Sequence, residues 1–321
     1  MPASVLELLT RDQPVLLDGG LATTLEERGH HLDDALWSAR LLLDDPDEVI
    51  AAHRSFLASG AEVLITASYQ LATASLSRAG HDPAMAHRLL IRSVELARTA
   101  IDQHDRSQPD APGARVAGSV GPYGAVLADG SEYRGRYGLS VDELAAFHAP
   151  RVQALADAGV DLLACETVPS GDEVRALARV LDGIGTPAWI SLTVGPSGRV
   201  TPEGQPLAEA VAPLGDVEEV VAIGVNCCPP DRVGAALDGL AALGRAMVAY
   251  PNLGARWDPA AMTWRPDAMP DALAHERLSG WWERGATLIG GCCGTTPGTL
   301  ADLGRRLREV AFPSQRSRGR G

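Results

Sequence analysis

Short apolar runs alternate with longer amphipathic segments along most of the chain. The longer segments, such as residues 47–60 and 141–159, carry apolar residues at three- and four-residue spacing and often end in glycine. This is the pattern of a helix followed by its C-terminal cap. The apolar runs have the length of strands. They cover residues 15–17, 62–67, 115–120, 161–165, 188–194, 220–225, 246–250 and 286–289.

Eight strands separated by helices predict parallel pairing and an α/β fold. We expect the sheet to close into a (β/α)8 TIM barrel, which takes about 250 residues plus insertions and suits a chain of 321 residues. A doubly wound sheet is the competing arrangement, but it usually has fewer strands, and no Gly-x-Gly-x-x-Gly follows the first run. Residues 1–312 show no break in composition and predict a single domain. Residues 313–321 are polar, basic and glycine-rich, and predict a disordered tail.

Polar and glycine-rich motifs follow the apolar runs. DGG at residues 18–20 follows the first run, Glu166 follows the fourth, and GGCCG at residues 290–294 follows the eighth. In a barrel these strand ends all lie on the C-terminal face, where barrel active sites form. A carboxylate at that rim, such as Glu166, is therefore expected to bind substrate rather than to serve as a solvated surface charge.

Three of the five cysteines occur at predicted strand ends: Cys227 after the sixth run, and the adjacent pair Cys292 and Cys293 after the eighth. Three thiolates that converge on one point make a Zn²⁺ site with an open fourth position, which is typical of catalytic zinc. The flanking glycines let the backbone turn so that both adjacent thiols can face one metal. The sequence therefore predicts Zn²⁺ as the cofactor, held by these three residues and able to keep a substrate thiol as a nucleophilic thiolate.

Other interpretations of the cysteines remain open. Lone cysteines are most often buried structural thiols, and Cys165, inside an apolar strand, is expected to be one. A closed structural zinc site without catalysis would need a fourth ligand. Cys228 is a candidate for it, although alternation along a strand points its side chain away from that of Cys227. Reversible disulfides are a third possibility, but vicinal cysteines make a strained disulfide and no Cys-x-x-Cys motif is present.

Charge and hydropathy disfavour several classes of partner. The net charge is −13, which disfavours nucleic acid, and no apolar run approaches the roughly 20 residues that span a membrane. The N-terminus lacks the basic and apolar regions of a signal peptide, and the five cysteines do not resemble a disulfide framework. We expect a cytoplasmic protein that acts on small molecules, and the sequence leaves its oligomeric state open.

Characteristic motifs are distributed from about residue 10 to residue 310. They are DGGLATTLEERG, LWSA, GAEVLITASYQ, GSVGPYGA, SEYRGRYG, ETVP, GVNC, YPN and GGCCGTTP. Together they resemble the homocysteine S-methyltransferase family of zinc-dependent barrel enzymes, and most closely the class that uses S-methylmethionine or S-adenosylmethionine. The resemblance implies transfer of a methyl group from such an onium donor to homocysteine, giving methionine.

The resemblance also implies roles for residues at the strand ends. Asp18 and Glu166 would hold the ammonium group of homocysteine, although turn chemistry is the ordinary role of an aspartate at such a position. Gly19 and Gly20 would let the substrate approach the backbone closely, and Asn226 would orient a metal ligand or the substrate. Zinc coordination would deprotonate the substrate thiol, so no catalytic side chain beyond this activation and no covalent enzyme intermediate are expected.

Trp37 and Tyr69 are candidates for binding the methyl donor, because aromatic faces attract sulfonium and quaternary ammonium cations. Core packing is the alternative role for both, and Tyr123 is a weaker candidate. Leu253 and Ala255 occupy positions at which a more polar motif is common in the family. The donor therefore stays open among S-methylmethionine, S-adenosylmethionine and betaine, and selenocysteine or another thiol is the alternative acceptor.

Overall fold

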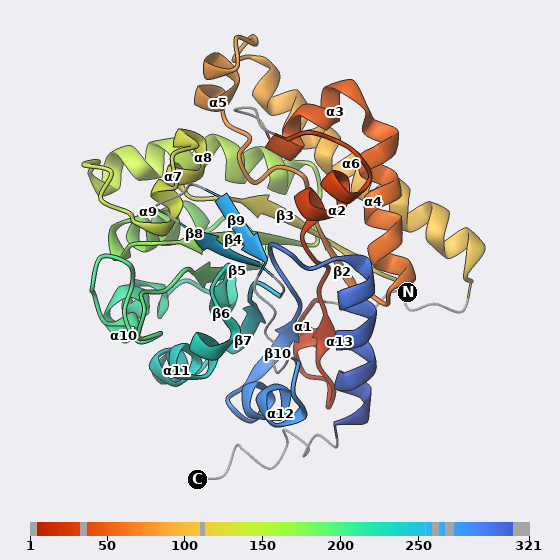
Figure 1. Cartoon of the computed structure of the whole chain (residues 1–321). Coiled ribbons are helices and arrows are strands. Elements are labelled where there is room, and N and C mark those ends of the chain that lie inside the picture. The colour runs from red at the N-terminus through yellow and green to blue at the C-terminus, as the bar shows by residue number, and fades with distance from the viewer. Residues whose placement is uncertain are drawn as a thin grey trace.

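The computed structural model shows a barrel of parallel strands surrounded by helices (Figure 1). It describes residues 5–32, 37–109, 113–253, 255–258, 263–266 and 273–310, with the backbone alone for residues 37–38, 255–258 and 263–266. The expected tail, residues 313–321, lies outside these ranges. Within them, no helix combines the length and the apolar character needed to cross a membrane.

Eight parallel strands form the barrel, and each matches one of the predicted apolar runs. They are β1 (Val15–Leu16), β2 (Val63–Ile65), β3 (Arg115–Val120), β4 (Leu162–Val168), β5 (Ala188–Leu192), β6 (Val220–Asn226), β7 (Ala246–Tyr250) and β10 (Ala286–Ile289). Hydrogen bonds join them in the order β1-β10-β7-β6-β5-β4-β3-β2. A parallel bridge between Leu17 and Val63 brings β1 beside β2, where the Glu62 N–H donates to the Leu16 carbonyl at 2.7 Å. The predicted (β/α)8 barrel is confirmed.

Helices connect the strands and cover the outside of the barrel (Figure 1). The longer ones are α4 (Pro46–Ala58), α6 (Met85–Ser107), α8 (Val141–Asp157), α9 (Gly171–Leu181), α11 (Pro230–Leu240), α12 (His275–Glu283) and α13 (Pro297–Glu309). The shorter ones are α1 (Val5–Leu9), α2 (Leu21–Glu27), α3 (Leu41–Asp44), α5 (Thr73–Arg78), α7 (Tyr123–Leu127) and α10 (Leu207–Val211). The 3₁₀ turns are η1 (Trp37–Arg40), η2 (Ser131–Tyr133), η3 (Ala212–Leu214) and η4 (Ala241–Leu243).

Local sequence sets where the helices begin and end. A capping box starts α8: Ser140 Oγ accepts from the Glu143 N–H, and the Glu143 carboxylate accepts from the Ser140 N–H. At helix ends, Gly60, Gly159 and Gly285 adopt φ angles of 97°, 75° and 98° shortly before β2, β4 and β10. Glycine takes this left-handed conformation without strain, so these residues are the helix caps that the sequence predicts.

Two apolar layers fill the space on either side of the strands. The outer layer packs between strands and helices and contains Cys165 and Cys228, so Cys165 has the core position expected for it. The inner layer fills the barrel and contains Trp189 and Tyr250, both buried. Because side chains alternate along a strand, Ala164 faces the inner layer and Cys165 the outer one, and the next residue of β4 faces the interior again.

Two strands extend further than predicted, and one element was not predicted. β4 continues to Val168 and β6 to Asn226, so Glu166 and Asn226 lie within the strands rather than after them. Because polar residues stand at these positions, the apolar runs end before the strands do.

After β7, an antiparallel hairpin pairs β8 (Ala255–Asp258) with β9 (Thr263–Pro266) in a segment where no strand was expected.

Candidate metal and substrate site

Cysteines from two strand ends meet at the C-terminal mouth of the barrel. The sulfur atoms of Cys227, Cys292 and Cys293 lie within 4.8 Å of one another, and those of Cys227 and Cys293 are 3.6 Å apart. A backbone hydrogen bond of 2.8 Å from the Cys292 N–H to the Pro251 carbonyl ties the cysteine loop to the end of β7. The structure thus brings together the three residues expected to bind a metal.

Two residues at this mouth adopt a backbone conformation that residues other than glycine rarely take. Cys227 has a φ of 48° and Thr167 a φ of 61°, and such positions cost roughly 1–3 kcal/mol each. In a continued strand, Cys227 would point opposite to Asn226 and away from the barrel interior. The left-handed turn instead brings its thiol to the other two thiols, while Cys228 packs into the outer layer.

The sulfur spacing fits a metal ion. Tetrahedral zinc with Zn–S bonds of about 2.3 Å places its sulfur ligands about 3.8 Å apart, close to the 3.6 Å between Cys227 and Cys293. Hydrogen bonds from the neighbouring thiols lower the pKa of Cys227 to about 5, and the same bonds to Cys227 raise the pKa of Cys292 and Cys293 well above the usual range. The group therefore carries one negative charge readily, and a cation is needed to stabilise three thiolates together.

Within the described ranges, only these three cysteines group as potential metal ligands. Cys228, the candidate fourth ligand of a closed site, is buried in the outer layer, and burial raises the pKa of its thiol to about 12. The described residues therefore offer three ligands, which leaves one position of a tetrahedral metal to a substrate.

Tyr133 contacts the cysteine group and was not predicted as a site residue. It ends η2, and its hydroxyl oxygen lies 3.3 Å from Cys227 Sγ. Burial, together with the charge of Cys227, raises the pKa of Tyr133, so the phenol stays protonated and can donate to the thiolate. Its only sequence signal is the motif SEYRGRYG, which supports the resemblance without indicating that this tyrosine meets a cysteine 94 residues away.

Two buried carboxylates line the barrel beside the cysteines. Glu166 accepts hydrogen bonds from Ser119 Oγ and, at 3.1 Å, from the Tyr250 hydroxyl, and burial raises its pKa to about 8. Asp18 Oδ2 accepts from the Ile65 N–H at 2.8 Å, whereas its buried Oδ1 has no partner in the described part of the chain. Burial and the charge of Glu166 raise the pKa of Asp18. These neighbouring carboxylates retain acceptor capacity that suits an ammonium ion, and their role in binding homocysteine stays a prediction.

Gly19 and Gly20 lie where the segment after β1 packs against the cysteine loop. A Cβ at Gly19 would lie 2.7 Å from the Thr295 carbonyl oxygen, and one at Gly20 would lie 2.8 Å from the Cys292 carbonyl oxygen. The glycines therefore allow two loops of the protein itself to meet, a reason that the sequence did not indicate. Their close approach to a substrate stays a prediction.

Asn226 links three strands to the cysteine group. Its Oδ1 accepts from the Thr167 N–H at 2.7 Å and from Ser191 Oγ at 2.9 Å, and its Nδ2 donates to Thr167 Oγ1 at 2.8 Å. The same Nδ2 lies 4.0 Å from Cys292 Sγ. These contacts hold Thr167 in its left-handed conformation and are compatible with the orienting role expected of Asn226.

The candidate donor residues differ in what the structure describes. Tyr69 follows β2 and forms a hydrogen bond with Thr167, to which Asn226 also bonds beside the thiols, and burial raises the pKa of Tyr69. Trp37 begins η1, but its side chain lies outside the described part of the structure. Tyr123 packs edge-on against Tyr137, with ring centroids 5.3 Å apart, so packing accounts for it.

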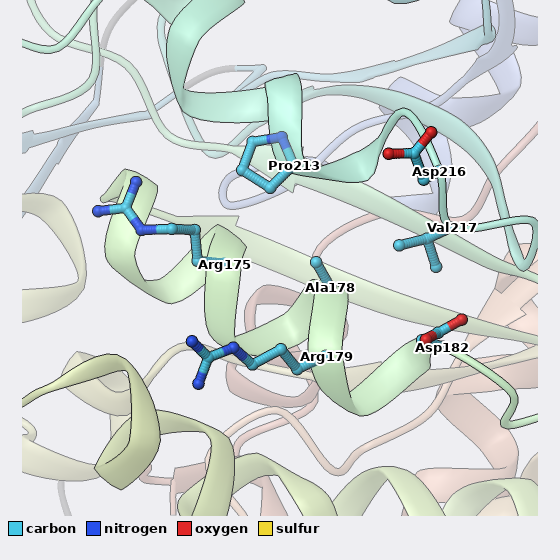
Figure 2. Close-up of a pocket in the computed structure, with 7 residues that line it drawn as sticks. All are labelled: Arg175, Ala178, Arg179, Asp182, Pro213, Asp216 and Val217. Atoms are coloured by element: carbon cyan, nitrogen blue, oxygen red, sulfur yellow. The ribbon is translucent and has the colours of Figure 1, made fainter.

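A separate pocket lies on the outside of the barrel between α9 and η3 (Figure 2). It is lined by Arg175, Ala178, Arg179, Asp182, Pro213, Asp216 and Val217. The two arginines form ion pairs with Asp172 and Asp142 respectively, so both already have counter-ions. None of the expected site residues lines this pocket, and the mouth of the barrel is the candidate site.

Comparison with known proteins relates nearly the whole chain to one family. A family model described as homocysteine S-methyltransferase matches residues 15–307. The homocysteine S-methyltransferase of Escherichia coli (strain K12) is 45% identical over 303 residues, covering 93% of this chain and 97% of that protein. The crystal structure of the Escherichia coli homocysteine methyltransferase MmuM in its metallated form matches with a TM-score of 0.83 and 43% identity, covering 94% of this chain and 98% of that chain. The selenocysteine Se-methyltransferase of Brassica oleracea var. italica is 37% identical, covering 94% of this chain and 92% of that protein. The chain belongs to the homocysteine S-methyltransferase family.

Proposed function

We propose that this enzyme uses zinc to transfer a methyl group from an onium donor to homocysteine, giving methionine. The observation that carries the proposal is the grouping of Cys227, Cys292 and Cys293, whose sulfurs lie within 4.8 Å of one another at the mouth of the barrel. Three sulfur ligands favour a borderline-soft cation such as Zn²⁺. Similarity to a metallated homocysteine methyltransferase supports both the metal and the acceptor.

The three cysteines would hold zinc as thiolates, and the bound metal would supply the positive charge that keeps a substrate thiol deprotonated at neutral pH. Residues around the three cysteines affect the charge on the thiols and hold the neighbouring backbone in place. Tyr133 donates a hydrogen bond to Cys227, and Asn226 fixes the left-handed turn at Thr167 beside the site. The metal position is therefore held by strand ends whose conformations are tied to one another.

Asp18 and Glu166 bind the ammonium group of homocysteine in this proposal, through the free Oδ1 of Asp18 and the remaining acceptor capacity of Glu166. The substrate thiolate forms a bond to the methyl carbon while the bond from that carbon to the donor breaks, and the electron pair leaves with the donor. No protein group accepts a proton in this step. Catalysis thus depends on positioning the donor methyl in line with the thiolate.

The donor in this proposal is S-methylmethionine or S-adenosylmethionine, with betaine as the alternative. Tyr69, which bonds to Thr167 beside the cysteine group, would turn its ring towards the donor cation, and Trp37 stays a candidate on sequence grounds. Selenocysteine is a second candidate acceptor, because the selenocysteine Se-methyltransferase of Brassica oleracea var. italica matches over 94% of this chain.

An assay with zinc-quantified, freshly reduced protein tests the proposal. Homocysteine is combined with each of the three donors separately, with and without a chelator. We expect methionine from a sulfonium donor, loss of activity after zinc removal, and recovery after zinc is restored. Stoichiometric zinc without methionine from any donor would exclude homocysteine as the acceptor, and would favour selenocysteine or a closed structural site.

The proposal extends to the cell compartment and to the domain organisation. All five cysteines are free thiols, and a site built from three of them suits a reducing compartment such as the cytoplasm. Residues 1–312 would form one domain, because β1 and β10 from opposite ends of this range pair in the same barrel.

A further inference from the structure

Glu132 lies on the segment that contacts the cysteine group, and its buried Oε2 atom has no hydrogen-bond partner among the described residues. Glu132 directly precedes Tyr133 in η2, and the Tyr133 hydroxyl contacts Cys227. Helix α7 packs closely against this segment, since a Cβ at Gly124 would lie 2.4 Å from the Glu132 nitrogen. The backbone that carries the carboxylate is therefore firmly placed.

Two tyrosines interact electrostatically with this carboxylate. Besides burial, the charge of Glu132 raises the pKa of Tyr69 and of Tyr133. The charge of Cys227 acts on Tyr69 and Tyr133 in the same way. A molecule bound against the Tyr133 hydroxyl, which lies 3.3 Å from Cys227 Sγ, would lie beside both the metal site and the turn that carries Glu132.

Among the described residues, the charge of Arg134 lowers the pKa of Glu132 by less than burial raises it. Arg134 lies on the same segment, but its guanidinium donates to the Asp129 carbonyl at 3.1 Å and to Ser131 Oγ at 3.2 Å. Burial consequently dominates and raises the pKa of Glu132 to about 7. A desolvated carboxylate beside aromatic rings suits an organic cation, because the carboxylate supplies charge and the ring faces add cation–π attraction.

We propose that Glu132 binds the α-ammonium group of the methyl donor and so selects amino-acid sulfonium donors over betaine. The inference rests on the proposed function, because it assumes a donor bound beside the metal site. An ammonium group has three N–H bonds, and one of them would satisfy the unpartnered Oε2 atom. The quaternary nitrogen of betaine has no N–H bond to donate, so betaine cannot satisfy the Oε2 atom in this way.

The test compares Glu132→Gln with the wild type, both loaded with zinc, using two sulfonium donors. S-methylmethionine carries an α-ammonium group, and dimethylsulfoniopropionate carries none. We expect the KM for S-methylmethionine to rise at least about tenfold, as for a lost hydrogen bond between charged groups. The KM for homocysteine, the zinc content and the KM for dimethylsulfoniopropionate should stay within about threefold.

Two further variants sharpen the comparison. Glu218→Gln removes a carboxylate at an exposed position outside this segment, and it should leave both donor KM values unchanged. Glu132→Asp keeps the negative charge on a side chain that is one methylene shorter, so the carboxylate lies further from the donor. The ratio of the KM for S-methylmethionine to the KM for dimethylsulfoniopropionate should therefore move towards the ratio in Glu132→Gln. This variant carries the test if Glu132→Gln fails to fold.

Each result decides the inference. An unchanged KM for S-methylmethionine in Glu132→Gln, or an equal loss with both sulfonium donors, would overturn it while methyl transfer to homocysteine itself stands. Wild-type enzyme that is inactive with every donor would overturn the proposed function, and the inference with it, before any variant is compared. A selective loss with S-methylmethionine would support both.

Discussion

The two sides of the site are built differently. The strand side consists of residues within or directly after barrel strands: Asp18, Glu166 and Asn226. The loop side consists of residues in the connections beyond β2 and β3: Tyr69, Glu132 and Tyr133. Strand-side groups bond to neighbouring strands, as Asn226 does to Thr167 and Ser191. The barrel therefore fixes the strand side directly.

A buried arginine outside the barrel helps to fix the loop side. Arg151 of α8 donates to the Tyr69 carbonyl at 2.8 Å and to the Gly121 carbonyl at 2.9 Å, and so ties the β2 and β3 loops together. Glu173 of α9 accepts from the Tyr123 N–H at 2.6 Å. Loops held in this way can change without altering the strand register. We therefore expect the strand side to determine the acceptor and the loop side to determine the donor.

The largest effect should come from removing a metal ligand, which both sides require. Cys227→Ser should lose zinc and reduce methyl transfer by more than about 100-fold, because even residues behind the ligands typically contribute 10–100-fold. Zinc content and initial rate measure this. Cys228→Ser is the matched control, since Cys228 packs in the outer layer. Equal zinc loss in the two variants would mean that Cys228 is a ligand and that the site is closed.

A large effect on the strand side should come from Glu166→Gln. We expect the KM for homocysteine to rise by about ten- to 100-fold, as for a lost bond between an ammonium ion and a carboxylate, while the donor KM stays constant. Steady-state kinetics with each substrate varied in turn separate the two. Glu218→Gln, at an exposed position, is the control. A donor KM that rises in parallel with that of homocysteine would break the division between the two sides.

The same variant should be more stable than the wild type above neutral pH. The pKa of Glu166 is about 8 in the folded protein, against an ordinary value of 4.5. Between these values the unfolded chain releases the proton and the folded protein retains it, so stability falls as pH rises through this window. Glutamine has no such proton. Metal-free Glu166→Gln should therefore gain about 1–3 kcal/mol at pH 8 and nothing near pH 4, measured by denaturant unfolding.

The difference between the two sides also explains what the sequence could predict. Residues such as Asp18, Glu166 and Cys227 stand near the ends of apolar runs, and barrel geometry alone brings such ends to one face. Tyr133 and Glu132 lie in a connection whose path depends on packing against α7 and β4, and no periodicity encodes that path. The left-handed turns at Thr167 and Cys227 escaped prediction for a related reason, since neither residue favours that conformation by itself.

A smaller effect, confined to the loop side, should follow from Arg151→Lys. Lysine keeps the charge but cannot hold the Tyr69 and Gly121 carbonyls in the same forked arrangement. We expect the donor KM to rise by about three- to tenfold, as for one weakened hydrogen bond, with the KM for homocysteine and the zinc content unchanged. If homocysteine binding falls equally, Arg151 supports the fold as a whole and not the loop side in particular.

The smallest effect should come from Tyr133→Phe, which removes the contact where the loop side meets a metal ligand. The Tyr133 hydroxyl lies 3.3 Å from Cys227 Sγ and helps to lower the pKa of Cys227. Without it, the Cys227 thiol of metal-free protein should ionise at higher pH, which thiolate absorbance reports. Zinc should stay bound and kcat should change by about two- to fivefold, the range for one neutral hydrogen bond.

Tyr137→Phe is the control for this smallest effect, because Tyr137 packs against Tyr123 in the same region. It should leave both the ionisation of Cys227 and kcat unchanged. If Tyr133→Phe instead shifts only the donor KM, the hydroxyl serves donor binding and the two sides act independently. If it shifts kcat together with the ionisation of Cys227, the loop that recognises the donor also adjusts the charge on the metal ligand, and the two sides are coupled through this single contact.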